Sequence, residues 1–361
     1  ENALNTKAFP SLAAIQADVV GWTGSLLNAP PEAAGFMTSG GTDSILCAVL
    51  AARERGAKER GITAPEMVLA ESAHAAFHKA AHMFGVKAVK TRVRPDWTAD
   101  PDAMRAAVTP NTVLVVGSAP QYPQGVVDDI PAIAALAAGA GASCHVDACM
   151  GGFVLPFAER LGRPVPPWDF RVPGVTSISA DVHKLGYAPK GASVVLYRTK
   201  ALRAYQTFLF DDWLGGFYGS PGLQGTRSGL PMAAAWAVMR HLGVEGYLKL
   251  TEATLANADR IRAAIAAIPG LRVLGDSRYH LVALSADPAA AAPLDVFALG
   301  DALAKRGWYL DRQGPPDSLH MTVSASNTKA VEAFVADLEA AAAGIGAGRA
   351  ADRSTTYATL D

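Results

Sequence analysis

The stretches Cys144-His145-Val146-Asp147-Ala148 and Ser179-Ala180-Asp181-Val182-His183-Lys184 together decide the fold of this chain. Each stretch overlaps a short β-prone run, the first at residues 143–146 and the second at residues 177–180. Polar residues follow each run. In open α/β sheets, ligands bind beyond the carboxyl ends of the strands. The two stretches therefore predict buried strands whose ends bring Asp147 and Lys184 into one site.

A lysine and an aspartate in such a site have a specific chemical use. A lysine amine can condense with the aldehyde of pyridoxal phosphate (PLP) to form a Schiff base. A carboxylate at the pyridine nitrogen keeps that nitrogen protonated, so the ring can accept electrons from a breaking bond. Alone, a lysine after a strand is commonly solvated and an aspartate there is often a turn residue. Together, Lys184 and Asp147 predict PLP as the cofactor.

A turn rich in glycine supplies a candidate phosphate site. Thr38-Ser39-Gly40-Gly41-Thr42-Asp43-Ser44 precedes an apolar, alanine-rich helical pattern at residues 45–53. Glycines here bring backbone N–H groups and the positive end of the helix up to an anion. The turn lacks the Gly-Lys-Ser/Thr of a P-loop and the spacing of a dinucleotide fingerprint. We interpret Gly41 and Thr42 as cofactor-binding residues; an ordinary N-capped helix is the alternative that this turn alone leaves open.

Composition favours small-molecule chemistry. Of the 361 residues, 50% are apolar and 18% are charged, and the formal net charge is −1, so no nucleic-acid surface or electrostatic membrane patch is expected. The three cysteines have no metal-binding spacing and predict reduced thiols in a cytoplasmic protein. No run approaches about 18 apolar residues, so we expect a soluble chain. The chain begins at Glu1, which leaves an upstream segment open.

The order of predicted elements indicates an α/β protein with two domains. Strand-like runs separated by helical patterns predict a mainly parallel sheet covered by helices. After Gly243 the pattern changes to that of a smaller α+β domain. We expect an N-terminal arm and helix at 1–35, a cofactor-binding domain at 36–243, a second domain at 244–343 and a flexible tail at 344–361. The predicted strands of the large domain are 67–70, 88–93, 112–117, 143–146, 177–180 and 193–197.

Several blocks of the chain, in order, resemble the sphingosine-1-phosphate lyases, members of the PLP-dependent group II decarboxylase family with the aspartate-aminotransferase (type I) fold. The resemblance runs from about residue 9 to about residue 325. It implies a mainly parallel seven-stranded-type sheet, PLP, and a homodimer with shared active sites. The blocks are Phe9-Pro10-Ser11-Leu12, the turn at 38–44, Ser72-Ala73-His74-Ala75-Ala76-Phe77, Ser118-Ala119-Pro120-Gln121-Tyr122-Pro123, His145-Val146-Asp147-Ala148-Cys149, the run 170–180, and Gly186-Tyr187-Ala188-Pro189-Lys190-Gly191.

The resemblance also implies roles for individual residues. His74 is expected to stack on the pyridine ring, and His183 to bind the cofactor phosphate. Thr226 matches a serine that reaches the phosphate in the neighbouring subunit. Tyr122 and Lys190 match positions on the substrate side, where both are candidates for moving protons and Lys190 also for contacting the substrate phosphate.

The spacing of His74, His78 and His82 raises zinc as an alternative. The sequence lacks the glutamate of His-Glu-x-x-His, and no cysteine or aspartate nearby completes a tetrahedral set. We therefore expect no metal and interpret His78 and His82 as helix-surface residues.

The reaction implied by the resemblance is retro-aldol cleavage of sphingosine-1-phosphate, or a related phosphorylated long-chain base, to a long-chain aldehyde and phosphoethanolamine. One departure concerns recognition, because Asn5 replaces a histidine that lies near the substrate phosphate in the family. Amino-acid decarboxylation with the same cofactor is the closest alternative, because the cofactor residues serve both reactions. A catalytically silent scaffold is a further alternative, which the presence of both Lys184 and Asp147 disfavours.

Overall fold

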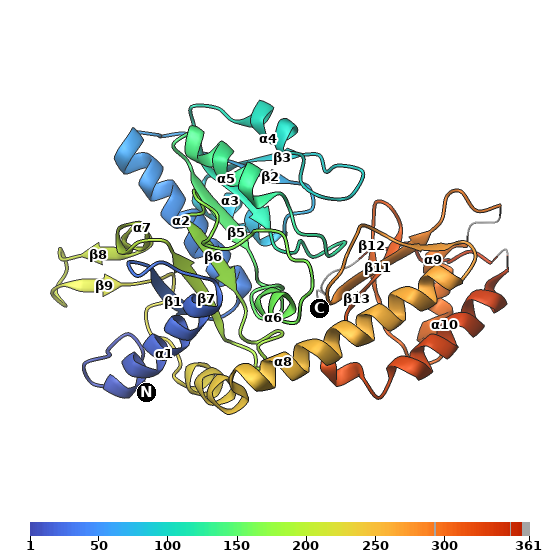
Figure 1. Ribbon diagram of the computed structural model, residues 1–361. Helices are drawn as coiled ribbons and strands as arrows, with labels where there is room; N and C mark the ends of the chain where they lie inside the picture. Colours follow the sequence, from blue (N-terminus) through green and yellow to red (C-terminus); the bar gives the residue numbers. More distant parts are fainter. Residues whose placement is uncertain (292–293, 347, 356–361) are drawn as a thin grey trace. The chain divides into compact units, whose positions relative to one another are not determined.

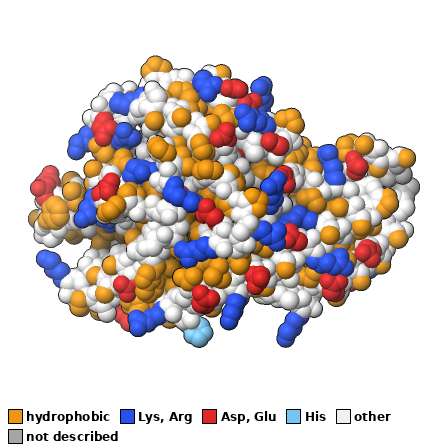
Figure 2. Space-filling model, in the orientation of Figure 1, with side chains coloured by type: hydrophobic (Ala, Val, Ile, Leu, Met, Phe, Trp, Pro, Cys, Tyr) orange, Lys and Arg blue, Asp and Glu red, His pale blue; other side chains and the backbone are white. Residues whose placement is uncertain are grey.

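The computed structural model describes residues 1–291, 294–346 and 348–355, which form two compact units. The first unit contains residues 1–121 and 127–247, and the second contains residues 122–126 and 248–361. Among the described helices, none is long and apolar enough to cross a membrane. Lys and Arg side chains are interspersed with Asp and Glu over the face seen in Figure 2.

The first unit is built on a seven-stranded sheet with the order β1-β7-β6-β5-β4-β2-β3 (Figure 1). The pairs β6–β5, β5–β4, β4–β2 and β2–β3 are parallel, whereas β7 runs antiparallel to both of its neighbours. The carboxyl ends of β1, β4, β5 and β6 therefore meet at one edge. The strands are β1 Ala34–Thr38, β2 Glu66–Ala70, β3 Lys87–Thr91, β4 Thr112–Ser118, β5 Ser143–Asp147, β6 Ser177–Ala180 and β7 Ser193–Tyr197.

Helices pack on both sides of the sheet, because its central strands are buried on both faces. All residues of β2, β4, β5, β6 and β7 are buried. Helix α2 packs against β4, β6 and β7, and α5 packs against β4 and β5. The helices and remaining strands of this unit are α1 Pro10–Leu26, α2 Gly41–Arg60, α3 Ala76–Phe84, α4 Pro101–Ala107, α5 Ile130–Gly139, α6 Leu155–Arg160, α7 Lys200–Ala204, β8 Phe208–Phe210, β9 Tyr218–Ser220 and the first part of α8 Leu230–Ala267.

The second unit contains a four-stranded antiparallel sheet with the order β10-β11-β13-β12, together with helices. Leu303 and Leu338, from α9 and α10, pack with Leu284 and Leu319 of the sheet in one buried cluster. Besides the end of α8, the elements are β10 Leu271–Val273, β11 Leu281–Ala286, α9 Val296–Ala304, β12 Asp311–Gln313, β13 Ser318–Thr322, the short 3₁₀ helix Ala325–Asn327 and α10 Val331–Ile345.

The predicted strands of the large domain are confirmed as β2 to β7, and the α/β fold class is confirmed with them. The sequence analysis missed β1, a five-residue edge strand that pairs with β7. The first unit ends at Tyr247, and α8 is interrupted at Gly243, where the backbone is left-handed with φ 56°. Residues 122–126 belong to the second unit although the sequence analysis assigned them to the large domain.

Part of the predicted tail contacts the second unit. Helix α10 continues to Ile345, and Arg353 pairs with Asp295 at 2.7 Å and also with Asp317. Residues 347 and 356–361 of the predicted tail lie outside the described residues.

Two glycines allow the segment after β5 to pass close to the neighbouring strand ends. A Cβ on Gly151 would lie 2.1 Å from the carbonyl oxygen of Ala119, and one on Gly152 would lie 2.6 Å from the Cβ of Ala180. Because a backbone atom cannot move away cheaply, Gly151 has no room for a side chain.

We expect Gly151→Ala to lower the free energy of unfolding by about 1–3 kcal/mol, as for an overpacked core. Gly21, inside α1, is a matched control because an added Cβ would meet no atom within 4 Å. Gly21→Ala should raise stability by about 0.5–1 kcal/mol. Urea unfolding followed by circular dichroism measures both, and equal stabilities of the two variants would contradict the prediction.

Candidate active site

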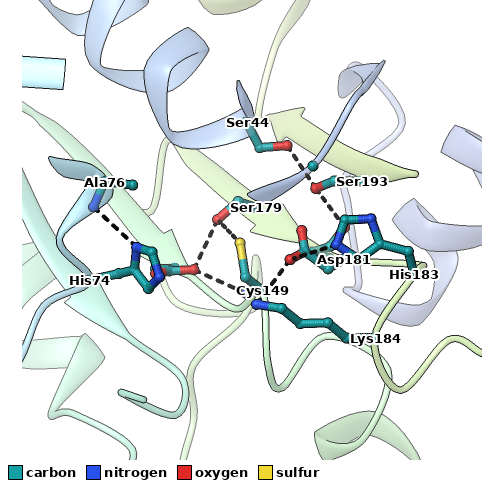
Figure 3. A network of polar contacts seen from close by, with 12 residues as sticks. Ser44, His74, Ala76, Cys149, Ser179, Asp181, His183, Lys184 and Ser193 are labelled. Carbon is teal, nitrogen blue, oxygen red and sulfur yellow. Dashed lines mark hydrogen bonds and ion pairs between the residues drawn. The ribbon is translucent and has the colours of Figure 1, made fainter. Parts of the chain in front are cut away.

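Strands β5 and β6 bring Asp147, predicted to bind the cofactor, and Lys184, predicted to be catalytic, to the same edge of the sheet. Asp147 is the last residue of β5 and pairs in register with Ser179 of β6. Beyond the end of β6, the amine of Lys184 lies 3.0 Å from the Oδ2 atom of Asp181 (Figure 3). The side chain of Lys184 is three-quarters buried and that of Asp181 is almost fully buried.

Opposite charges at this edge change the ionisation of both groups. Burial alone would lower the pKa of Lys184, but Asp181, with a contribution from Asp147, raises it above its usual value. Burial would raise the pKa of Asp147, but His74, the hydrogen bond from Cys149 and the charge of Lys184 together lower it. Before cofactor attachment the site therefore holds two carboxylates and one ammonium group.

Hydrogen bonds fix the carboxylate of Asp147. Its Oδ1 atom accepts from the backbone N–H of Cys149 at 3.0 Å and from the hydroxyl of Ser179 at 3.3 Å. The thiol of Cys149 also donates to Ser179 at 3.3 Å (Figure 3). Burial and the nearby Asp147 raise the pKa of Cys149 well above its usual value, so this thiol stays protonated.

The glycine turn faces this group of residues. A Cβ on Gly41 would lie 2.7 Å from Asp181 Oδ2 and 2.9 Å from Cys149 Sγ, and one on Gly40 would lie 3.3 Å from His183. Helix α2 begins at Gly41 without a side-chain cap, so its first N–H groups have no intrahelical partner and lie at the end of the helix next to Asp181. The Oδ1 atom of Asp181 is buried and has no hydrogen-bond partner among the described residues. This arrangement of a lysine, an acid and a bare helix N-terminus fits PLP.

The two predicted cofactor histidines are both held by backbone N–H groups. His74 Nδ1 accepts from Ala76 at 3.1 Å, and His183 Nδ1 accepts from Gly191 at 3.2 Å and from Ala192 at 3.1 Å. Burial lowers the pKa of both rings. Each ring is therefore neutral near pH 7, with its proton on Nε2, which in His183 lies 3.6 Å from Asp181.

The zinc alternative gains no support. His74 precedes α3, whereas His78 and His82 lie exposed on that helix, as predicted. In the part of the chain that the structure describes, no group of three or more His, Cys, Asp or Glu could hold a metal ion.

The turn that follows Lys184 is tightly wound. Tyr187 has a left-handed backbone with φ 58°, which costs a non-glycine residue about 1–3 kcal/mol. The hydroxyl of Tyr247 donates to the carbonyl of Gly186 at 2.8 Å and supports the turn. Lys190 is exposed, and its amine donates to the carbonyl of His183 at 3.1 Å.

Three further predicted residues belong to the second unit or lie at the surface. Tyr122 belongs to the second unit, where its hydroxyl donates to Asp311 at 3.0 Å. Thr226 is exposed, whereas the neighbouring Arg227 is buried. Asn5 is exposed, and its side-chain oxygen accepts from the N–H of Ala8 at 3.3 Å. The catalytic, cofactor or substrate roles of these residues stay predictions.

The sequence analysis assigned no role to Ser179, Cys149 or Asp181. Strand periodicity contained a signal for Ser179, because residues in register on neighbouring strands point to the same face. Asp181 offered another signal, since a carboxylate three residues before a catalytic lysine can pair with its amine.

Comparison with known proteins shows the family to which the chain belongs. Residues 1–286 match the model of the pyridoxal-dependent decarboxylase conserved domain, and the chain belongs to this family. Its cofactor is PLP, and the fold is that of the PLP-dependent enzymes.

Within the family, the chain is similar to sphingosine-1-phosphate lyases. It is 42% identical to the rice protein over 94% of this chain and 63% of that protein, and 43% identical to the rat protein over 91% and 57%. The chain thus spans about three-fifths of these curated relatives. The solved Burkholderia pseudomallei sphingosine-1-phosphate lyase is 44% identical, with a TM-score of 0.90 over 94% of this chain and 79% of that chain. Lactobacillus brevis glutamate decarboxylase, at 22% identity and a TM-score of 0.83 over 94% and 82%, shares the fold.

The pairing of Lys184 with Asp181 leads to a test of cofactor attachment. Only an unprotonated amine can attack the PLP aldehyde, and Asp181 favours the protonated form. We expect Asp181→Asn to speed attachment of PLP to the apoenzyme at pH 7 by about tenfold or more, because an opposite charge within hydrogen-bonding distance is lost. The growth of visible absorbance gives the rate. Asp102→Asn, at an exposed site, is the control. A slower or unchanged rate in Asp181→Asn would refute the proposed electrostatic effect.

Proposed function

We propose that this chain is a carbon–carbon lyase that cleaves sphingosine-1-phosphate or a related phosphorylated long-chain base by a retro-aldol reaction. The products are a long-chain aldehyde and phosphoethanolamine. The observation that carries the proposal is the meeting of Lys184 and Asp147 at one sheet edge in a chain 44% identical to a bacterial sphingosine-1-phosphate lyase.

The residues at the edge have distinct proposed roles in holding the cofactor. Lys184 holds PLP covalently, and Asp147 pairs with its ring nitrogen. Gly41 and Thr42 bind its phosphate through the start of α2, and His183 supports the same group. His74 stacks on the ring. When bound, PLP supplies an electron sink for the bond that breaks at the substrate α-carbon.

Proton transfer and substrate recognition are assigned to a second set of residues. Lys184, Lys190 and Tyr122 are the proposed groups that move protons at the 3-hydroxyl and the α-carbon. Lys190, exposed beside the turn after Lys184, also offers a cation to the substrate phosphate. Asn5 supplies a neutral contact, which is weaker than a charge-assisted one. The proposed location is cytoplasmic, which agrees with the free, buried thiols of Cys47, Cys144 and Cys149.

Product analysis tests the proposed reaction. Incubation of the PLP-loaded protein with sphingosine-1-phosphate should give hexadecenal and phosphoethanolamine by mass spectrometry, and Lys184→Ala should remove the activity. An exposed lysine, changed in Lys79→Ala, is the matched control and should leave it intact. Release of carbon dioxide from amino acids without cleavage of the phosphorylated base would instead identify a decarboxylase.

We also propose a homodimer with shared active sites, in which Thr226 contacts the cofactor phosphate of the other subunit. The hairpin of β8 and β9 supports this assignment (Figure 1). Monomeric proteins rarely expose a continuous apolar patch of large side chains. Exposed Thr226 comes six residues after Ser220, the last residue of this hairpin. The exposed large hydrophobic residues of the hairpin are Phe208, Leu209, Phe210, Trp213, Leu214 and Phe217.

If the hairpin binds a second copy, placing a charge on it should separate the subunits. We expect Phe217→Asp to convert a dimer into a monomer in sedimentation velocity and to weaken PLP binding. Phe217 is 73% exposed, so the change should cost little folding stability. Tyr309→Asp changes a similarly exposed aromatic residue, 84% exposed, in the second unit and should leave the dimer intact. A wild-type monomer would contradict the proposed assembly.

A further inference from the structure

Beneath Asp147 lies a row of buried polar side chains that the proposed chemistry does not use. In the parallel pairing of β5 with β6, His145 is opposite Ser177 and Asp147 is opposite Ser179. Because strand side chains alternate between faces, these four side chains point to the same face of the sheet. His145 and Ser179 are completely buried. Phe77 packs on the histidine ring at a centroid distance of 5.9 Å, which separates the ring from water.

The hydrogen bonds in this row have only one consistent direction. Asp147 is a carboxylate and can only accept, so the single hydroxyl proton of Ser179 points to its Oδ1 atom, 3.3 Å away. The Nε2 atom of His145 lies 3.1 Å from the same hydroxyl oxygen, so it must donate a proton to Ser179. The Nδ1 atom is then bare and accepts from the hydroxyl of Ser177 at 2.9 Å.

The electrostatics of the row agree with this direction. Burial lowers the pKa of His145 to about 4, although Asp147 opposes the effect. The ring is therefore neutral near pH 7 and has one donor and one acceptor nitrogen. Both nitrogens of the ring therefore have hydrogen-bond partners. Each donor in the row, from Ser177 through His145 to Ser179, points toward Asp147.

We propose that His145 and Ser179 are positioning residues that hold Asp147 as a hydrogen-bonded carboxylate, so that a proton shared with the PLP ring nitrogen stays on the nitrogen. The inference rests on the proposed role of Asp147. The donors from Ser179 and Cys149 both end on Oδ1, which directs Oδ2 to the cofactor. Each donor makes the carboxylate a weaker base. A weaker base takes the shared proton less readily and leaves the ring a better electron acceptor.

The first test is made on the wild-type protein and needs no cofactor. In the wild-type apoenzyme labelled with ¹⁵N-histidine, the ring of His145 should give the spectrum of a neutral imidazole protonated on Nε2 at pH 7. Assignment uses His145→Gln. A ring protonated on Nδ1, or a doubly protonated ring, would overturn the proposed direction of the hydrogen bonds from Ser177 to Asp147.

The second test removes the hydroxyl next to Asp147. In Ser179→Ala loaded with ¹⁵N-labelled PLP, the ring-nitrogen signal should move toward the unprotonated position, and PLP affinity should fall by about tenfold. Ser179→Thr keeps the hydroxyl and should restore both values. Ser193→Ala is the matched control, because Ser193 is a buried serine on β7 that bonds Ser44 and the carbonyl of Ala180 instead.

Asp147→Asn separates failure of this inference from failure of the cofactor assignment. If Asp147→Asn moves the ring-nitrogen signal and a folded Ser179→Ala does not, the positioning role is wrong and the assignment of Asp147 stands. If Asp147→Asn also leaves the signal unchanged, Asp147 is not the partner of the ring nitrogen. Movement in both variants, with rescue by threonine, supports the chain from His145 to Asp147.

Discussion

The parallel pairing of β5 with β6 is the interaction on which the site depends. Its register places Asp147 against Ser179, and because the strands run in the same direction, both end at one edge of the sheet. Asp147 and Lys184, which are far apart in the sequence, are therefore brought to the same edge by the pairing of the strands. Strand β1 ends at the same edge, since it runs opposite to β7, and the start of α2 at Gly41 follows directly.

The same edge of the sheet carries more negative than positive charge. Burying an ion is costly unless it is paired, and here Asp147 and Asp181 are buried around the single ammonium group of Lys184. The nearby rings of His74 and His183 are neutral because burial lowers their pKa values. The site therefore carries an excess of negative charge, which suits a protonated ring nitrogen. The proposed binding of the cofactor phosphate relies on the uncharged N–H groups at the start of α2 rather than on a cation.

Sequence patterns predicted the central sheet because its strands are short apolar runs with polar ends. The same patterns pointed to Asp147 and Lys184, which come after the ends of two such runs. They also pointed to the turn at Gly41, which begins a helix. They missed β1, because its sequence Ala-Gly-Phe-Met-Thr contains a glycine and only one β-branched residue and so gives little strand signal. Ser179 and Asp181 escaped notice for different reasons. Alternation along the strand indicates the face of Ser179, but its pairing with Asp147 depends on the register between two strands, which is tertiary information. The spacing of Asp181 to Lys184 is local and could have been used.

The residues at the sheet edge do not by themselves explain which bond at the substrate α-carbon is cleaved. The lysine and acid serve any reaction that leaves negative charge on the α-carbon, and a decarboxylase of 22% identity has the same fold. The choice must instead come from groups that orient the substrate. The proposed candidates lie on loops and on the N-terminal arm: Lys190 in the turn after Lys184, Tyr122 in the second unit, and Asn5. Such segments can change their residues without disturbing the strand register, so one cofactor edge can be combined with different substrate contacts.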